Sequence, residues 1–420
     1  MLLHGVLKRL VKTGALTVID HHGRPQHYGT AANTDGPDDR RVVIRLHKAS
    51  TAWRLALNPK LALGEAYMDG DLTVEQGSIY DFLTTVVQDM GPHGALPFQG
   101  LMRLWERTVR LWYQFNPEAA ASRRVRHHYD LDGRLYDLFL DTDKQYSCAY
   151  FPTPDTTLEQ AQLAKKRHIA AKLKLEPGMT VLEIGCGWGG LALYLAETCG
   201  VEVTGITLSH EQHAIATRRA QERGLSDRVK FHIQDYRTLA GQFDRIVSVG
   251  MFEHVGVPHY REYFSGIHRL LKDDGVALLH SIGRSEGPGT TPAFIRKYIF
   301  PGGYIPALSE VIPVVEQSQL WVTDIEILRL HYAETLKHWR ERFMAQWDKA
   351  KALYDERFCR MWEFYLAASE VTFRHWGHMV FQAQLTKKVD ALPITRDYMN
   401  EGERALAARE KPQRPFAKTG

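Results

Sequence analysis

The chain has 420 residues, which exceeds a typical domain of roughly 100–200 residues, so we expect two domains. Hydrophobic residues make up 44% and charged residues 24%, as in an ordinary globular protein, and a net charge of +4 does not argue for a nucleic-acid partner. No run of about 18 uncharged apolar residues occurs, which excludes a membrane-spanning helix, and residues 1–16 lack the apolar core of a signal peptide.

Residues 1–112 indicate a small domain of mixed α/β structure. Residues 41–47 alternate apolar and polar side chains, as a half-buried strand does, and residues 79–87 have helical spacing. Residues 91–100 contain two Pro and three Gly and predict a break. Helical spacing returns over residues 101–115.

Residues 113–138 are predicted to form a linker, because most of this stretch is polar and basic. Basic residues gather at two places: Arg123, Arg124 and Arg126, and further on Lys337, His338, Arg340 and Arg342. A solvated face explains either cluster, and contact with anionic lipid headgroups is the alternative.

Residues 139–420 alternate between strand and helix patterns, which predicts a catalytic α/β domain with a doubly wound parallel sheet. Thr156 and Glu159 have the spacing of a capping box that opens a helix. Short apolar runs predict strands at 180–184, 201–206, 229–233, 243–249 and 276–282. Helices are predicted at 191–199, 211–223 and 260–271. A late strand pair, 322–330 and 378–385, encloses two amphipathic helices, 335–352 and 356–375.

The four cysteines fit neither a zinc site nor a disulfide framework by their spacing, so we expect no metal. They are Cys148, Cys186, Cys199 and Cys359. Free thiols favour a reducing compartment, and we therefore expect a cytoplasmic protein.

A glycine-rich turn follows the first predicted parallel strand. Glu183 precedes Gly185, Gly187 and Gly189, and this Gly-x-Gly-x-Gly pattern favours S-adenosylmethionine (SAM) over a dinucleotide. Gly190 weakens the distinction, because it also completes the Gly-x-Gly-x-x-Gly pattern of dinucleotide-binding proteins. A tight turn without a ligand is the structural alternative.

Polar residues follow the next two strands at the same edge of the predicted sheet. Thr207 and Gln212 lie where side chains can reach the ribose and the amino-acid end of a cofactor, and Ser209 between them can cap the next helix. Asp235 and Tyr236 follow the third strand. Asp235 fits both a contact with the adenine amino group and a helix cap.

Two further residues come at the carboxyl ends of the fourth and fifth strands. Glu253 and His280 are expected to converge on the crevice that the cofactor occupies, either as functional groups or as a buried structural pair.

Several separated stretches resemble the cyclopropane-fatty-acyl-phospholipid synthase family, which includes the mycolic acid cyclopropane synthases and methyltransferases. They are Tyr146-Ser-Cys-Ala-Tyr-Phe, Leu182-Glu-Ile-Gly-Cys-Gly-Trp-Gly, Ile206-Thr-Leu-Ser, Phe252-Glu-His, His280-Ser-Ile and Leu330-His-Tyr-Ala-Glu-Thr-Leu. Leu63-Gly-Glu-Ala-Tyr-Met-Asp-Gly-Asp resembles the extra N-terminal domain of the phospholipid-acting members, which the mycolic acid members lack. The N-terminal domain, residues 1–112, is therefore expected to position the active site on lipid, with holding the dimer in shape as the alternative.

The resemblance implies a class I methyltransferase with two sets of site residues. The set implied to bind SAM is Tyr146, Ser147, Gly185, Gly187, Thr207, Leu208, Gln212, Asp235 and Tyr236. The set implied to hold a bicarbonate ion beside the reacting carbon is Cys148, Glu253, His280, the backbone of Ile282, and Tyr332.

The implied reaction adds the SAM methyl group to the cis double bond of a phospholipid acyl chain and closes a cyclopropane ring after bicarbonate removes a proton from a carbocation. Glu253 and His280 are expected to form a hydrogen-bonded pair that orients the ion. Residues 294–308 are a candidate wall or lid for the acyl chain, with an ordinary surface loop as the alternative. The family also implies a homodimer that works at the surface of the inner membrane.

Three other functions remain open from the sequence. The same fold and first step give a methyl-branched chain if the ring does not close. A methyltransferase acting on small soluble molecules would leave the N-terminal domain unexplained. A lipid-binding protein without activity would leave the intact site residues unexplained.

Overall fold

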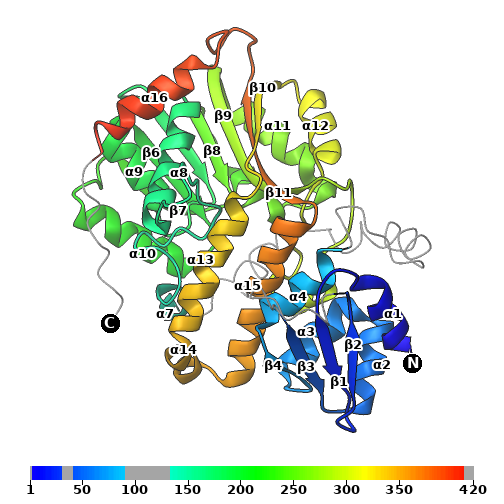
Figure 1. Cartoon of the computed structure of the whole chain (residues 1–420). Coiled ribbons are helices and arrows are strands. Elements are labelled where there is room, and N and C mark those ends of the chain that lie inside the picture. Colours follow the sequence, from blue (N-terminus) through cyan, green and yellow to red (C-terminus); the bar gives the residue numbers. More distant parts are fainter. Residues whose placement is uncertain (1, 31–40, 90–132, 411–420) are drawn as a thin grey trace. The chain divides into compact units, whose positions relative to one another are not determined.

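The computed structural model describes residues 2–30, 41–89 and 133–410 (Figure 1). The chain divides into two compact units. Unit 1 comprises the described parts of residues 1–104, with residues 291–300 and 333–378. Unit 2 comprises the described parts of residues 105–290, 301–332 and 379–420.

Two segments of the predicted catalytic domain, residues 291–300 and 333–378, thus group with the N-terminal part of the chain. The predicted helix at 101–115, the basic cluster at 123–126 and most of the predicted linker lie outside the described residues.

Unit 1 contains a four-stranded sheet with the strand order β2-β1-β3-β4. Its strands are β1 (Leu16–Ile19), β2 (Pro25–Tyr28), β3 (Val42–Leu46) and β4 (Leu72–Gln76). Strand β1 pairs antiparallel with β2 and parallel with β3, and β4 pairs antiparallel with β3. Strand β3 confirms the predicted alternation, because Val42, Ile44 and Leu46 are buried and the residues between them are only half-buried.

Four helices accompany this sheet: α1 (Leu2–Leu10), α2 (Ala49–Leu57), α3 (Pro59–Met68) and α4 (Ile79–Val87). Helix α4 confirms the prediction at 79–87. A capping box fixes its start, because the Asp81 backbone N–H donates to Ser78 Oγ at 3.2 Å and the Ser78 N–H donates to the Asp81 carboxylate at 2.9 Å.

The later part of unit 1 is helical. Helix α15 (Glu356–His375) confirms the prediction at 356–375, and it packs against α3 and α4. The single helix predicted at 335–352 is wrong: α13 (His331–Ala345) and α14 (Trp347–Leu353) are separate, because Gln346 has non-helical backbone angles (φ −117°, ψ 21°).

The basic cluster at residues 337–342 lies on α13 and serves internal contacts at least in part. Arg340 pairs with Glu370 at 3.0 Å, and its guanidinium lies 4.4 Å from the centre of the Tyr80 ring. Lys337 lies 3.9 Å from Glu341 one turn on.

Unit 2 contains a seven-stranded sheet with the order β10-β11-β9-β8-β5-β6-β7. Its strands are β5 (Thr180–Ile184), β6 (Glu202–Thr207), β7 (Val229–Ile233), β8 (Phe243–Val249), β9 (Leu271–Arg284), β10 (Trp321–Ile327) and β11 (His378–Thr386). Strands β5 to β9 pair in parallel, and β10 pairs antiparallel with β11. The predicted parallel sheet and late strand pair are confirmed.

Helices cover both faces of this sheet (Figure 1). The described α-helices of unit 2 are α7 (Gly133–Asp137), α8 (Leu158–Lys172), α9 (Gly190–Cys199), α10 (His210–Glu222), α11 (Tyr260–Leu270), α12 (Leu308–Gln317) and α16 (Asp397–Ala407). Two apolar clusters lie on opposite faces of β5, because Val181 packs in one and Leu182 and Ile184 pack in the other. All four cysteines are buried, and none of them forms a disulfide bond.

The predicted capping box of α8 is displaced by one residue. Thr157 and Gln160 form it, whereas Thr156 Oγ1 accepts a hydrogen bond from the Thr153 N–H at 3.2 Å. Ser209 caps α10 as predicted, accepting from the Gln212 N–H at 3.3 Å.

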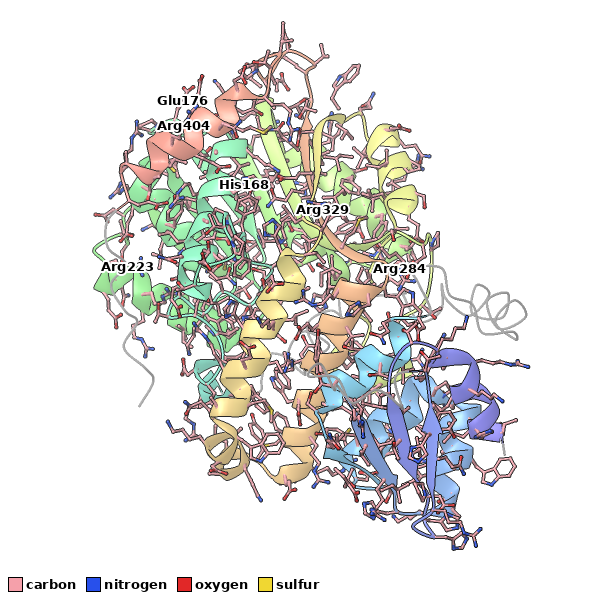
Figure 2. The ribbon with its side chains drawn as sticks, viewed as in Figure 1. His168, Glu176, Arg223, Arg284, Arg329 and Arg404 are labelled. Atoms are coloured by element: carbon pink, nitrogen blue, oxygen red, sulfur yellow. The ribbon has the colours of Figure 1, made fainter. Side chains whose placement is uncertain are left out.

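The C-terminal helix α16 packs against α8, and His168 on α8 joins it to the sheet (Figure 2). The His168 ring lies 2.6 Å from Glu326 on β10 and 2.5 Å from Glu403 on α16. Burial acts to lower the pKa of His168, but hydrogen bonds to both glutamates outweigh it and raise this pKa above its usual value. A protonated His168 therefore stabilises this junction.

No helix in the described ranges combines the length and apolar character needed to cross a bilayer.

Candidate active site

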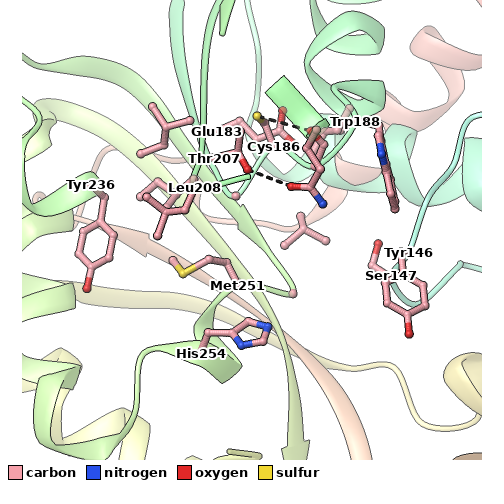
Figure 3. Close-up of a pocket in the computed structure, with 18 of the residues that line it drawn as sticks. Tyr146, Ser147, Glu183, Cys186, Trp188, Thr207, Leu208, Tyr236, Met251 and His254 are labelled. Atoms are coloured by element: carbon pink, nitrogen blue, oxygen red, sulfur yellow. Dashed lines mark hydrogen bonds between the residues drawn. The ribbon is translucent and has the colours of Figure 1, made fainter. Parts of the chain in front are cut away.

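A cavity lies at the carboxyl ends of β5, β6 and β8 in unit 2 (Figure 3). Parallel α/β sheets bind ligands at this edge. All nine residues implied to bind SAM line the cavity: Tyr146, Ser147, Gly185, Gly187, Thr207, Leu208, Gln212, Asp235 and Tyr236. We call it the cofactor cavity.

Two positions after β5 require glycine, each for a different physical reason. Gly185 has a left-handed backbone (φ +84°), and a Cβ there would lie 2.8 Å from Met251. Gly190 does not line the cavity, and a Cβ on it would collide with the side chains of Gln145 and Asp143. The last glycine of the Gly-x-Gly-x-x-Gly pattern is therefore needed for close packing and does not face the cavity.

Buried charges shape the loop that carries Tyr146 and Ser147. The Asp141 carboxylate accepts from the backbone N–H groups of Asp143 and Gln145 at 3.0 and 2.8 Å. Asp143 pairs with Lys166 at 2.6 Å and with Arg219. Although burial acts to raise the pKa of Asp143, these two cations hold it below its usual value. The network fixes the loop against α8 and α10.

Lys165 on α8 places a buried ammonium group at the wall of the cofactor cavity. It donates to Gln145 Oε1 at 2.7 Å and to Ser147 Oγ at 2.9 Å. Burial lowers the pKa of Lys165 to about 8. Our sequence reasoning missed this residue, because the run from Lys165 to His168 resembles a solvated basic face.

Glu183 places a buried carboxyl group at the same cavity. The side chain is buried, its Oε2 atom has no hydrogen-bond partner within the described structure, and burial raises its pKa to about 8. An amino acid carries one ammonium and one carboxylate group. Glu183 and Lys165 can pair with these two groups, so the chemistry of the cavity fits the methionine end of SAM.

Thr207 and Gln212, which also line the cavity, form a hydrogen-bonded pair. Thr207 Oγ1 donates to Gln212 Oε1 at 2.9 Å, which holds the amide of Gln212 in place (Figure 3). Because the amide oxygen is used, the amide nitrogen is left as a donor for ligand oxygens.

Asp235 forms the helix cap, one of the two alternatives that its sequence position left open. Its carboxylate accepts from the Arg237 N–H at 3.0 Å and pairs with the Arg237 guanidinium at 2.6 Å, so it caps the short helix at Tyr236–Thr238. It also lines the cofactor cavity beside the buried Tyr236 ring.

None of the five implied bicarbonate ligands lines the cofactor cavity, but two of them meet directly. The Ile282 backbone N–H donates to Glu253 Oε1 at 2.6 Å. The expected Glu253–His280 hydrogen bond is not made: Glu253 Oε2 has no partner among the described residues, and His280 Nδ1 lies 3.1 Å from the amide nitrogen of Gln382 on β11. Glu253 and His280 thus have separate partners.

Glu253 has the features of a proton acceptor. It is buried, and burial raises its pKa to about 7. Its Oε2 atom has no hydrogen-bond partner among the described groups, although Oε1 is engaged. A buried carboxylate oxygen in this state suits a ligand that carries a proton, such as bicarbonate.

Cys148 and Tyr332 are also buried. The segment after Cys148 is tied to the start of α13: the Phe151 N–H donates to His331 Nδ1 at 2.9 Å, and the Tyr150 and His331 rings stack at 4.7 Å. The residues that follow Cys148 in the sequence therefore contact His331, the residue directly before Tyr332.

Residues 294–308 are not an ordinary surface loop, since Phe294, Ile299 and Tyr304 are almost fully buried. The segment contains a short π-helix at Ile295–Ile299. The Tyr304 backbone N–H donates to the carbonyl oxygen of Glu253 at 2.8 Å. This part of the segment therefore borders Glu253.

The sequence profile of the family described as mycolic acid cyclopropane synthetase matches residues 117–383, and that of a domain of unknown function matches residues 4–92. The chain is 39% identical to the cyclopropane-fatty-acyl-phospholipid synthase of Escherichia coli strain K12, over 86% of this chain and 91% of that protein. It is 34% identical to the tuberculostearic acid methyltransferase UfaA1 of Mycobacterium tuberculosis, over 86% and 87% of the two chains.

Solved structures extend the likeness to the fold. The cyclopropane synthase MmaA2 from Mycobacterium tuberculosis has a TM-score of 0.61 and 34% identity, covering 64% of this chain and 99% of that chain. The mycolic acid cyclopropane synthase CmaA1 complexed with SAH and CTAB gives the same values. With the observed strand order, these neighbours confirm the predicted class I methyltransferase fold.

Proposed function

The chain belongs to the mycolic acid cyclopropane synthetase family of SAM-dependent methyltransferases, and from this membership we propose that it makes cyclopropane fatty acids in membrane phospholipids. A methylene group derived from the SAM methyl group is added across the cis double bond of an unsaturated acyl chain. The similarity to the Escherichia coli phospholipid synthase over most of both chains supports this substrate.

The observation that carries the proposal is the buried ammonium group of Lys165 and the buried carboxyl group of Glu183 at the cofactor cavity, which the nine implied SAM residues also line. SAM supplies an electrophilic methyl group when bound. Lys165 and Glu183 complement its carboxylate and ammonium groups, and Thr207 and Gln212 offer hydrogen bonds to its ribose. Fixing a reactant in this way converts a collision into a positioned encounter.

We propose bicarbonate as the second small molecule at the site, where it supplies the base that takes a proton from the alkylated chain. The unpartnered Glu253 Oε2 would accept the proton that bicarbonate carries. Burial lowers the pKa of His280 well below its usual value and keeps the ring neutral. Since the amide nitrogen of Gln382 donates to Nδ1, the ring proton is assigned to Nε2, which can donate to an anion.

The remaining implied ligands have narrower roles. Tyr332 offers a hydroxyl donor, and Cys148 a weak thiol donor that now points to the Ala149 carbonyl at 3.3 Å. The Ile282 N–H already serves Glu253, so within the proposal it positions this carboxylate and contacts the ion only if Glu253 shifts.

We also propose that the protein acts as a homodimer in the cytoplasm and reaches its substrate at the surface of the inner membrane. A phospholipid substrate requires contact with a bilayer, and SAM is a water-soluble donor. No nucleic-acid partner is proposed.

Lipid mass spectrometry on cells that express the wild type, Glu253→Gln or the control Glu222→Gln tests the function. Glu222 is an exposed residue on α10. Acyl chains that gain one methylene and resist hydrogenation, in the wild type and the control alone, are the expected result. A gain that hydrogenation still reduces would indicate methylation without ring closure. Unchanged lipids in the wild type, with SAM bound, would refute the lipid substrate.

A further inference from the structure

Helix α2 in unit 1 exposes two large apolar side chains on one face. The side chain of Trp53 is 60% exposed and that of Leu57 is 72% exposed, and the two are four residues apart, one turn along the helix. The opposite face of α2 supplies the core contacts, through the buried Thr51 and Leu55. Trp53 and Leu57 are therefore not needed to hold α2 in unit 1.

Helix α1 packs against α2 (Figure 1). Leu2 is 48% exposed, and Lys8 and Arg9 are exposed in the last turn. Neither Lys8 nor Arg9 forms an ion pair with any residue that the structure describes. We call Leu2, Lys8, Arg9, Trp53 and Leu57 the α1–α2 face.

The chain segments that contain α1 and α2 carry basic residues and no acidic ones. Residues 2–19 and 41–64 contain eight Lys and Arg and no Asp or Glu, whereas the whole chain has a net charge of only +4. Some of these cations are paired with acids from elsewhere in unit 1, as Arg45 is with Glu75 and Lys48 with Asp71 at 2.6 Å. Lys8 and Arg9 form no such pair with the described residues, and they lie on the helix that packs against α2.

We propose that the α1–α2 face docks the protein on an anionic phospholipid bilayer. Exposed Trp and Leu on one side of a helix enter the boundary between headgroups and acyl chains, and flanking cations are attracted to anionic headgroups. The indole of Trp suits this boundary, because it is apolar with one polar N–H group. The proposal rests on the function proposed above and names the surface that brings this enzyme to its substrate.

Another exposed tryptophan provides a contrast. Trp321 on β10 is 55% exposed, close to the value of Trp53, but its strand also carries the acidic residues Asp324 and Glu326. Both acids are paired, Asp324 with Arg396 at 2.7 Å and Glu326 with Lys172, and β10 has no Lys or Arg of its own to attract an anionic surface. Trp321→Ser is therefore a matched control that removes a similarly exposed indole from a strand without cations.

The test measures partition of the full-length protein onto sedimented vesicles of unsaturated phosphatidylglycerol or unsaturated phosphatidylcholine. The double variant Trp53→Ser/Leu57→Ser should bind both vesicle types at least about tenfold more weakly than the wild type. The double variant Lys8→Gln/Arg9→Gln should bind phosphatidylglycerol vesicles about 30-fold more weakly and change little on phosphatidylcholine. Trp321→Ser should bind as the wild type does.

Wild-type partition by both double variants would overturn the proposal, and so would an equal loss in Trp321→Ser. A change in oligomeric mass by light scattering, with vesicle binding unchanged, would instead assign the face to contact between copies of the chain and overturn it too. Because the cofactor cavity lies in unit 2, folding of unit 1 is checked separately: wild-type far-UV circular dichroism and a wild-type urea-unfolding curve show that each variant is folded.

Turnover of phospholipid in detergent micelles separates this proposal from the enzymatic one. Variants that lose vesicle binding but keep micellar turnover support the docking face. A wild type that converts no phospholipid in micelles refutes the proposed function, while the vesicle data still decide the docking face.

Discussion

Glu253→Gln should slow the reaction while leaving SAM affinity unchanged, because Glu253 lies outside the lining of the cofactor cavity. A positioned proton-accepting group contributes about 10²- to 10⁴-fold to a rate, and we expect kcat to fall by that factor. The pKa of about 7 caused by burial implies that wild-type turnover rises about tenfold between roughly pH 6 and pH 8. The variant should lack this rise.

The same carboxyl group should make stability depend on pH. Its pKa is raised from 4.5 in the unfolded chain to about 7 by burial, which corresponds to about 3 kcal/mol lost when it ionises inside the protein. The unfolded chain releases this proton first, so wild-type stability falls as pH rises between these two values. The variant should therefore gain stability relative to the wild type above pH 7 and gain nothing near pH 4. The cost of burying the amide lowers the stability of the variant by the same amount at both pH values.

Urea denaturation at acidic and alkaline pH, calorimetry with SAM and a pH–rate profile on micellar phospholipid measure these effects. Glu222→Gln serves as the control for loss of an exposed carboxylate. A variant with wild-type turnover would refute the assigned role of Glu253. A stability difference that is equal at both pH values would refute the reasoning on burial.

Three further perturbations test other parts of the site. Lys165→Met should weaken SAM binding about 10- to 100-fold in calorimetry, because charged hydrogen bonds contribute about 1.5–3 kcal/mol, and unchanged affinity would contradict its role. Gly190→Ala should lower the free energy of unfolding by about 1–3 kcal/mol in urea titrations, since its Cβ overlaps two side chains. His168→Gln should destabilise the protein below about pH 6.5, where the wild-type ring is protonated in both states, and the loss should shrink as pH rises through the raised folded pKa of His168. A melting-temperature difference that does not vary with pH would exclude this account of His168.

The sequence predicts the parallel strands well, because each is an apolar run that is buried on both faces, as β5 shows. Strand β9 begins earlier than predicted, since Lys272, Asp273 and Asp274 at its start are polar and exposed and hide the pattern. The shifted capping box of α8 arose because adjacent threonines each have a suitable partner three residues on. Helix α16 was not predicted. It is held in place by residues far away in the sequence, such as His168, which forms a hydrogen bond with Glu403.

The cofactor residues follow from sequence because they sit directly after strand ends, where topology decides their location. Lys165 could not be found in this way, since it comes from the middle of a helix and reaches the cavity only through packing. The partner of Glu253 was also beyond sequence reasoning. Whether Glu253 bonds His280 or the Ile282 N–H depends on the direction of its side chain, and the spacing of residues along the chain does not determine that direction.

The chain order of unit 1 has a consequence for biosynthesis. Helix α15 is made some 280 residues after α4, yet it packs against α3 and α4, and Tyr67 donates to Glu363 at 2.6 Å. The first part of the chain to leave the ribosome therefore waits for nearly the whole of translation before its partner emerges. During that interval the apolar side of α3 and α4 lacks its native cover. We expect the nascent N-terminal segment to depend on chaperones, and an early stop codon to yield an aggregating fragment rather than a small folded domain.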